Sequence, residues 1–390
     1  MAAFTLSKEE NQLIREVHEL SISKIAERGA YLDRVGDDKV DWKIPEYLAK
    51  MNLLAPIVPK EYGGRELSMM AATSIIEEIA LGCAGAAAIV VMNMYALTPL
   101  LIAGSDALKE QFLPDLCKSR PHLACLAISE ITPEHDLDRS SRPREDITRI
   151  TTTAEAQDGQ ITLNGIKDFV MNGGASDFVA VLARSKESKQ KSHLQMYLVP
   201  GRTPGLETNR VLNKVGMRSS HTVQLAFRDV RIPLEYRIGR DGSGYFLFTQ
   251  IFDRNMPLVA AIGVGIARAA YELTLQVVRT NQMLNRNSTV NQYVSSTLVD
   301  MSTEIDAARL AVMRAAHYVD TDDNYSRAAY MSKIYATRVA QWTTFQAVEI
   351  IGRMGFTVGH PAEKYLRDAQ MLSAIAGSEH LHKQVVSQQL

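Results

Sequence analysis

The sequence ITLNGIKDFVMNGGASDFVAVL at residues 161–182 contains two apolar runs of strand length, residues 161–163 and 178–182. The turn pair Asn-Gly occurs between them twice, at residues 164–165 and 172–173. Short apolar runs bounded by such pairs are typical of β-strands joined by tight turns. This stretch therefore predicts a β domain in the middle of the chain.

Other runs of strand length lie on both sides of this stretch. They occupy residues 123–128, 150–154, 194–199, 223–227 and 230–232. Because no long helical pattern separates them, we expect a compact antiparallel barrel or sandwich over residues 123–237. Residues 131–149 are polar, carry charges of both signs and lack periodicity, which predicts a solvated loop.

The rest of the chain has helical periodicity. Ser7 and Glu10 form a capping box at the start of the first helix, and Gly263 and Gly265 predict close helix packing near the end. Further helices are expected at residues 42–54, 68–83, 84–94, 106–118, 246–278, 292–317 and 326–351, and after Gly377. The predicted fold is α+β and multi-domain, with an N-terminal all-helical domain (1–122), a central antiparallel β domain (123–237) and a C-terminal four-helix bundle (238–390).

The composition is that of an ordinary globular protein. Of 390 residues 46% are hydrophobic, and 43 Lys and Arg against 44 Asp and Glu give a net charge of −1, so no nucleic-acid partner is expected. Three cysteines without metal-ligand spacing, and a start without a secretory signal, favour the cytoplasm. The apolar run at residues 84–102 is interrupted by Asn93, Thr98 and Pro99, so no membrane span is expected.

Several familiar catalytic motifs are missing from the sequence. It contains no GxGxxG after a strand, no phosphate-binding loop and no GxSxG nucleophile motif. His380 and His382 are two residues apart and point to different helix faces, so they predict no metal site. Glu77 and Glu78 are adjacent acidic residues and are expected on a solvated surface.

Seven short motifs occur in the order of one known family. They are PKEYGG at 59–64, LAISE at 126–130, LNGIK at 163–167, GMRSSHT at 216–222, FRDVRIP at 227–233, IIGRMGF at 350–356 and KYLRDA at 364–369. Together with the helical, β and helical order of domains, they resemble the acyl-CoA dehydrogenase family over nearly the whole chain. Each motif is weak alone, and their common order carries the resemblance.

The resemblance implies a flavoprotein fold in which FAD lies between the β domain and the C-terminal helices. In that family a glutamate removes the α-proton of an acyl thioester and hydride passes to the flavin. The implied cofactor-binding positions are Leu126, Ile128, Ser129, Phe169, Met171, Gly352, Gly377 and Ser378. The implied substrate-binding positions are Asp253, Asn255, Met256 and Ala376. The catalytic residues stay unassigned.

The sequence departs from the family pattern at the base. The usual glutamate position is occupied by Ala376, which cannot accept a proton. Some family members carry the base on the long helix, immediately before an arginine, and these two positions are Asn255 and Met256 here. Glu379 is either a shifted base or a carboxylate that interacts with a helix N-terminus.

The flavin contacts are also altered. Phe169 and Met171 replace a Trp and a Thr of the family, and methionine cannot donate a hydrogen bond to the flavin. Residues 281–285 read NQMLN in place of RxTFG, whose arginine reaches the pyrophosphate of a neighbouring subunit's FAD. Arg353 follows Gly352 where the family has a second glycine.

Three functions from different classes remain open. The first is a flavoprotein oxidoreductase with altered chemistry, acting on an acyl thioester carried by CoA or by a carrier protein. The second is a catalytically silent partner subunit of a hetero-oligomeric acyl-CoA dehydrogenase. The third is a flavin-free, non-redox acyl-thioester enzyme using Glu130, Asp253 or Glu379. The resemblance also implies a homodimer or homotetramer.

Overall fold

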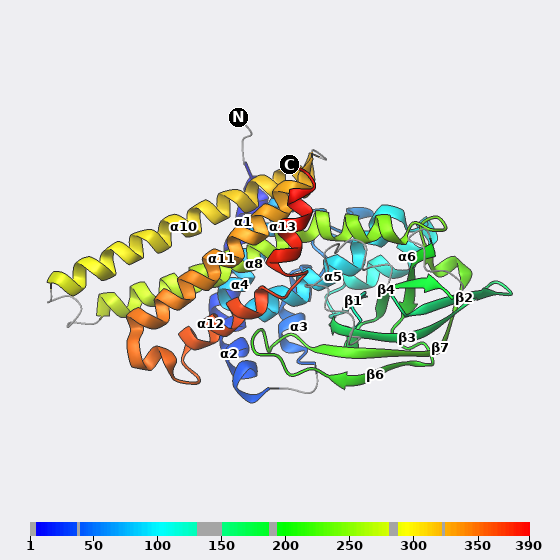
Figure 1. Ribbon diagram of the computed structural model, residues 1–390, viewed down its shortest axis with the longest axis horizontal. Coiled ribbons are helices and arrows are strands. Elements are labelled where there is room, and N and C mark those ends of the chain that lie inside the picture. The colour runs from blue at the N-terminus through cyan, green and yellow to red at the C-terminus, as the bar shows by residue number, and fades with distance from the viewer. Residues whose placement is uncertain (1–4, 37–39, 131–149, 187–192, 281–287, 322–323) are drawn as a thin grey trace.

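The computed structural model contains helical regions at both ends of the chain and a β-sheet between them, which confirms the predicted fold class (Figure 1). It describes residues 5–36, 40–130, 150–186, 193–280, 288–321 and 324–390. Residues 131–149, predicted as a solvated loop, lie outside the described residues.

Helices make up the N-terminal region. They are α1 (Lys8–Leu20), α2 (Ala26–Val35), α3 (Lys43–Lys50), α4 (Met69–Gly82), α5 (Ala84–Ala103) and α6 (Asp106–Leu116). The predicted capping box is confirmed: the Glu10 N–H donates to Ser7 Oγ at 3.1 Å, and the Ser7 N–H donates to Glu10 Oε2 at 2.8 Å. Helix α5 is buried along most of its length, as its Ala-rich composition predicts.

In the part of the chain that the structure describes, eight strands form one sheet. They are β1 (Ala124–Ala127), β2 (Thr153–Gln157), β3 (Gln160–Met171), β4 (Phe178–Ser185), β5 (Leu194–Pro200), β6 (Leu206–Val211), β7 (Thr222–Pro233) and β8 (Arg237–Ile238). Their order is β6-β7-β3-β2-β4-β5-β8, with β1 beside β4. Most neighbours are antiparallel, but β4 pairs in parallel with both β1 and β2. The two strands predicted at residues 223–232 are one strand, interrupted by an irregularity at Asp229, whose φ is +50°.

The C-terminal region has five helices within its described residues. They are α8 (Gly244–Thr280), α10 (Ser288–Asp320), α11 (Tyr325–Ile351), α12 (Pro361–Leu372) and α13 (Glu379–Ser387). The first three are long and run lengthwise beside one another (Figure 1). The close packing predicted at the glycines of α8 is confirmed, because a Cβ at Gly265 would lie 2.5 Å from the Glu77 carbonyl oxygen. A Cβ at Gly263 would lie 2.9 Å from the Ala336 carbonyl oxygen.

The acidic pair on α4 lies inside the protein, which corrects the expectation of a solvated surface. Glu77 and Glu78 are only 7% and 9% exposed. Arg268 of α8 approaches Glu78 at 2.5 Å, and Arg309 of α10 approaches Glu77 at 2.8 Å. Buried carboxylates need such partners. The pair therefore ties the N-terminal helices to the C-terminal ones.

Within the described residues, two helices are long and apolar enough to cross a membrane by length and composition alone. They are α5 and α8, of 20 and 37 residues. The structure buries 78% of the apolar window in α5 and 72% of that in α8. Both are therefore core helices of this fold, packed against each other and against α4.

Candidate functional site

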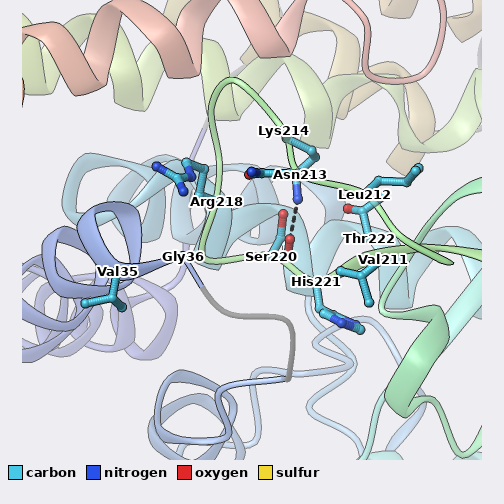
Figure 2. Close-up of a pocket in the computed structure, with 10 residues that line it drawn as sticks. All are labelled: Val35, Gly36, Val211, Leu212, Asn213, Lys214, Arg218, Ser220, His221 and Thr222. Atoms are coloured by element: carbon cyan, nitrogen blue, oxygen red, sulfur yellow. Dashed lines mark hydrogen bonds between the residues drawn. The ribbon is translucent and has the colours of Figure 1, made fainter.

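A cavity of about 570 Å³ lies where the N-terminal helices meet the sheet (Figure 2). Its wall combines Val35 and Gly36, at the end of α2, with residues 211–214 and 220–222 of the connection between β6 and β7. Arg218 completes it. None of the site residues implied by the sequence lines this cavity directly.

Two cationic side chains give the cavity its electrostatic character. Lys214 Nζ donates to the Ser220 carbonyl oxygen at 2.5 Å (Figure 2), and Arg218 Nη1 donates to the Asp33 carbonyl oxygen at 2.7 Å. Burial lowers the pKa of Lys214 to about 8, even though Asp368 opposes this shift. The cavity therefore favours an anionic or electron-rich ligand.

Contacts with α12 hold the connection between β6 and β7 in place. The Met217 N–H donates to Asp368 Oδ1 at 2.5 Å. Gly216 lies so close to α12 that a Cβ there would be 2.4 Å from the Arg367 carbonyl oxygen. The cavity wall is thus fixed by the C-terminal region as well as by the sheet.

Strand β3 ends beside the cavity. Met171 pairs in the sheet with Thr222, a lining residue, and is 7% exposed. Phe169 lies at a register shift, has a φ of +53° and leaves its ring 54% exposed. Thr222 Oγ1 is buried without a hydrogen-bond partner among the described residues. Thr222 therefore brings a hydroxyl with unused hydrogen-bonding capacity to the cavity wall, and Phe169 is an exposed aromatic residue two positions before Met171 on the same strand.

The end of β1 carries an exposed hydroxyl and a buried ion pair. Leu126 and Ile128 are half-buried and Ser129 is exposed. Glu130 Oε1 lies 2.7 Å from Lys167 Nζ, and both side chains are buried. Burial alone would raise the pKa of Glu130, but Lys167 and hydrogen bonds from residues 151–152 lower it to about 2.

The loop that contains Ala376 is held by two buried side chains. Ala376 and Gly377 have φ values of +58° and +101°. Lys333 Nζ donates to the Gly377 carbonyl oxygen at 3.1 Å, and His382 Nε2 lies 2.8 Å from the Ala376 carbonyl oxygen. A carbonyl can only accept, so Nε2 carries the hydrogen. Burial, with the nearby charge of Lys333, lowers the pKa of His382 to about 3, which keeps its ring neutral.

Helix α8 brings the other substrate positions to this loop. Asp253, Asn255 and Met256 are all buried. Met256 belongs to a small apolar cluster against which Phe252 and Ala376 pack. The structure therefore packs Met256 of α8 against the Ala376 loop.

The remaining cofactor positions divide into two groups. Ser378 follows Gly377 directly and caps α13, accepting from the Leu381 N–H at 3.3 Å. Gly352 directly follows the last residue of α11. It lies 19 residues beyond Lys333, which contacts the Ala376 loop, and this separation is roughly 28 Å along a helix. One chain alone therefore does not bring Gly352 to the Ala376 loop.

Comparisons with known proteins agree with this arrangement over the whole chain. Three domain families match in order: acyl-CoA dehydrogenase N-terminal domain at residues 7–120, middle domain at 126–230 and C-terminal domain at 242–390. The mitochondrial short-chain specific acyl-CoA dehydrogenase of Rattus norvegicus is 30% identical over 87% of this chain and 80% of its own length. The chain belongs to the acyl-CoA dehydrogenase family.

Two further relatives extend this comparison. Cyclohexane-1-carbonyl-CoA dehydrogenase of Geobacter metallireducens is 28% identical over 99% of this chain and 98% of its own length. The solved structure of butyryl-CoA dehydrogenase from Megasphaera elsdenii superposes with a TM-score of 0.91 at 26% identity, covering 100% of this chain and 99% of that one. The acyl-CoA dehydrogenase fold is thus present from end to end.

The residues present fit the ring portion of FAD, the cofactor of this family. Phe169 offers an exposed aromatic face for stacking. Ser129 offers an exposed hydroxyl, and Thr222 offers one without a partner in the described structure. Residues 281–285, which replace the family's pyrophosphate-binding segment, lie outside the described residues.

Glu130 and Glu379, two carboxylates near the site, are engaged in ion pairs. Glu130 forms the buried ion pair with Lys167 described above. Glu379 is paired with Arg338 and with Lys383, and the hydrogen bonds from these two cations lower its pKa to about 2. A carboxylate with so low a pKa is a poor proton acceptor at neutral pH. These contacts favour the second interpretation of Glu379, a carboxylate held at the start of α13, over the shifted base.

Sequence reasoning missed Lys214, Thr222, Lys333 and His382 as site residues. Lys214 and Thr222 flank or belong to the motif at residues 216–222, which resembles an acyl-CoA dehydrogenase motif and so contained a usable signal. Lys333 lies on α11, 43 residues before Ala376, and His382 lies on α13, six residues after it. Their role depends on how α11 and α13 pack, which no local pattern reveals.

Proposed function

We propose that this protein is a flavoprotein oxidoreductase that binds an acyl-CoA thioester and performs altered chemistry at the family's site. The proposal rests on the hydrogen bonds of the loop that contains Ala376. The base is missing there, yet His382 and Lys333 still bond to the loop carbonyls. A site that keeps its backbone geometry without its base supports thioester binding without the usual α-proton removal.

Several side chains would hold the two ligands. Phe169, Ser129 and Thr222 would contact the flavin ring, and FAD when bound supplies a two-electron acceptor. Asn255, Met256 and Ala376 would line the acyl portion of the thioester. The buried, apolar surroundings of Met256 exclude water from that portion.

The decisive experiment begins with the visible spectrum of the purified protein. We expect flavin bands near roughly 370 and 450 nm, which belong to the cofactor's own chemistry. Anaerobic addition of butanoyl-CoA should perturb these bands without bleaching them, because Ala376 cannot take the α-proton. A protein that stays colourless after incubation with FAD would refute the proposal.

Ala376→Glu provides the complementary test, with Ala376→Gln as the matched control. If the flavin and thioester sites are intact, the glutamate variant should bleach the 450 nm region, roughly placed as above, when butanoyl-CoA is added. The glutamine variant has the same shape but accepts no proton, so it should not bleach. Equal behaviour of the two variants would mean that the thioester site itself is rebuilt.

A silent partner subunit is the second candidate. It is favoured by the replacement of the pyrophosphate arginine within residues 281–285, since a related subunit would then have to complete the FAD site. Co-expression with related family members should yield a mixed complex if this candidate is right. We propose instead that the protein is a homodimer or homotetramer located in the cytoplasm. A stable homo-oligomer with activity of its own would contradict the silent-subunit candidate.

Flavin-free chemistry is the least supported alternative. It requires an acid–base group of its own, and the cations paired with Glu130 and Glu379 make these two carboxylates poor proton acceptors. Turnover of an acyl thioester without any electron acceptor would establish it. Whether the thioester is carried by CoA or by a carrier protein can be tested by comparing butanoyl-CoA with butanoyl carrier protein in the same assay.

A further inference from the structure

The contact between α5 and α8 contains polar groups in an otherwise apolar core. Tyr95 and Thr98 lie one helical turn apart on α5, and Phe252 and Asn255 lie one turn apart on α8. The Tyr95 and Phe252 rings meet edge to face with centroids 5.5 Å apart. Asn255 Nδ2 donates to Thr98 Oγ1 at 2.7 Å. The two pairs therefore face each other across the helix contact.

Hydrogen bonds determine the orientation of the Asn255 amide. Thr98 gives its only hydroxyl hydrogen to the Met94 carbonyl oxygen at 2.8 Å, so its oxygen can only accept from Asn255. The Ile251 carbonyl, 2.8 Å from the same Asn255 nitrogen, also can only accept. Both neighbours require the NH₂ group on this side. Asn255 Oδ1 is therefore the atom that points elsewhere.

Two polar atoms at this contact have unused hydrogen-bonding capacity. Tyr95 Oη and Asn255 Oδ1 are buried and have no hydrogen-bond partner among the described residues. Tyr95 is 2% exposed and Asn255 is fully buried. Burial, and then the charge of Asp253, raise the pKa of the Tyr95 phenol, so it remains a hydrogen-bond donor. One donor and one acceptor are thus kept in the core at a cost in stability.

This contact adjoins the position of the missing base. Phe252, which contacts the Tyr95 ring, packs against the same apolar cluster as Ala376. Met256, the residue after Asn255, belongs to that cluster. A ligand whose acyl group lies beside Ala376 would therefore extend toward Tyr95 and Asn255.

We propose that Tyr95 and Asn255 recognise a hydroxyl group on the acyl chain of the thioester. A hydroxyl accepts from the Tyr95 phenol and donates to Asn255 Oδ1, which satisfies both atoms, whereas an alkyl chain satisfies neither. A ketone would accept from Tyr95 but leave Asn255 without a partner. The inference rests on the proposed function, because it assumes that an acyl thioester binds beside Ala376.

The test is calorimetric titration of the protein with matched CoA thioesters. The probes are butanoyl-CoA, 3-hydroxybutanoyl-CoA and 4-hydroxybutanoyl-CoA, which share the CoA portion and differ by one hydroxyl. We expect one of the hydroxylated thioesters to bind about tenfold more tightly than butanoyl-CoA. Equal affinities would overturn the inference, since the two polar atoms would then be bonded to ordered water only. Binding of none of the three would overturn the proposed function, and the inference with it.

Substitutions then assign the preference to residues. Tyr95→Phe should lower the affinity for the hydroxylated thioester to that for butanoyl-CoA. Asn255→Leu should have the same effect, because it removes the acceptor atom Oδ1. Tyr335→Phe is the matched control, because its hydroxyl bonds Glu304 at 2.6 Å on another part of the C-terminal region. It should leave the preference intact. A preference that survives Tyr95→Phe would refute the assignment.

Discussion

Glu130→Gln should destabilise the protein strongly at neutral pH and less as the pH falls. The native carboxylate has its pKa lowered from an ordinary 4.5 to about 2 by Lys167 and its other hydrogen bonds, against the effect of burial. That difference corresponds to about 3 kcal/mol in favour of the folded protein with an ionised Glu130. The substitution also leaves Lys167, which is fully buried, without its counter-charge.

The sign of the pH dependence follows from the direction of the shift. A lowered pKa contributes stability above pH 4.5, and this contribution is lost as the pH falls from 4.5 toward 2. The difference in unfolding free energy between wild type and variant should therefore be about 3 kcal/mol at pH 7. It should be smaller by roughly 1 kcal/mol near pH 3.5.

Urea unfolding at several pH values between 7 and roughly 3.5 measures this difference. Glu155→Gln is the matched control, because Glu155 pairs with Lys186 at 2.9 Å with both side chains more than half exposed. Glu155→Gln should lower the unfolding free energy by less than about 1 kcal/mol at every pH. A cost for Glu130→Gln that does not change with pH would refute the reasoning, because the loss would then not come from an ionised carboxylate.

The remaining predictions concern packing and polar burial near the site. Gly216→Ala should cost about 1–3 kcal/mol of unfolding free energy in urea, because its new Cβ would lie 2.4 Å from the Arg367 carbonyl oxygen; an unchanged midpoint would contradict this. Tyr95→Phe should raise the unfolding free energy by about 1–3 kcal/mol, because it removes a buried hydroxyl without a partner; a clear loss of stability would show that the hydroxyl is bonded in solution. Glu379→Gln should leave the spectral response to butanoyl-CoA unchanged, since its carboxylate is held by Arg338; an altered response would restore it as a candidate base.

Local pattern predicted those elements whose signal is local. The long helices have an apolar periodicity that is visible in the sequence whatever the fold. The capping box at Ser7 needs only two residues three apart. Strand β6 escaped prediction because its sequence, LETNRV, is exposed over its four central residues and so has no apolar alternation. Strand β7 was divided because Arg228-Asp229 is typical of a turn, whereas in the structure Asn164 binds Asp229 within the sheet.

The chemistry of the site depended on contacts between distant parts of the chain. Nothing near Glu77 indicates that Arg268 and Arg309, more than 190 residues further on, will bury it. In the same way, the sequence places Glu130 near the site but does not show that Lys167 forms a buried ion pair with it. Pairing between distant residues therefore decides which carboxylates are available, and only the tertiary structure reveals it.

The residues around Ala376 support the proposal of a modified site over that of a decaying one. A chain that no longer binds a ligand gains stability by losing buried polar atoms without partners, each of which costs about 1–3 kcal/mol. Tyr95 Oη and Asn255 Oδ1 are two such atoms. Phe252, which contacts the Tyr95 ring, and Met256, which follows Asn255, belong to the apolar contacts of Ala376. The carbonyls of that loop nevertheless remain bonded to Lys333 and His382. Retaining a costly polar pair next to a well-held backbone is expected when a ligand supplies the missing bonds, which supports the proposal that the site still binds a thioester and has changed its chemistry.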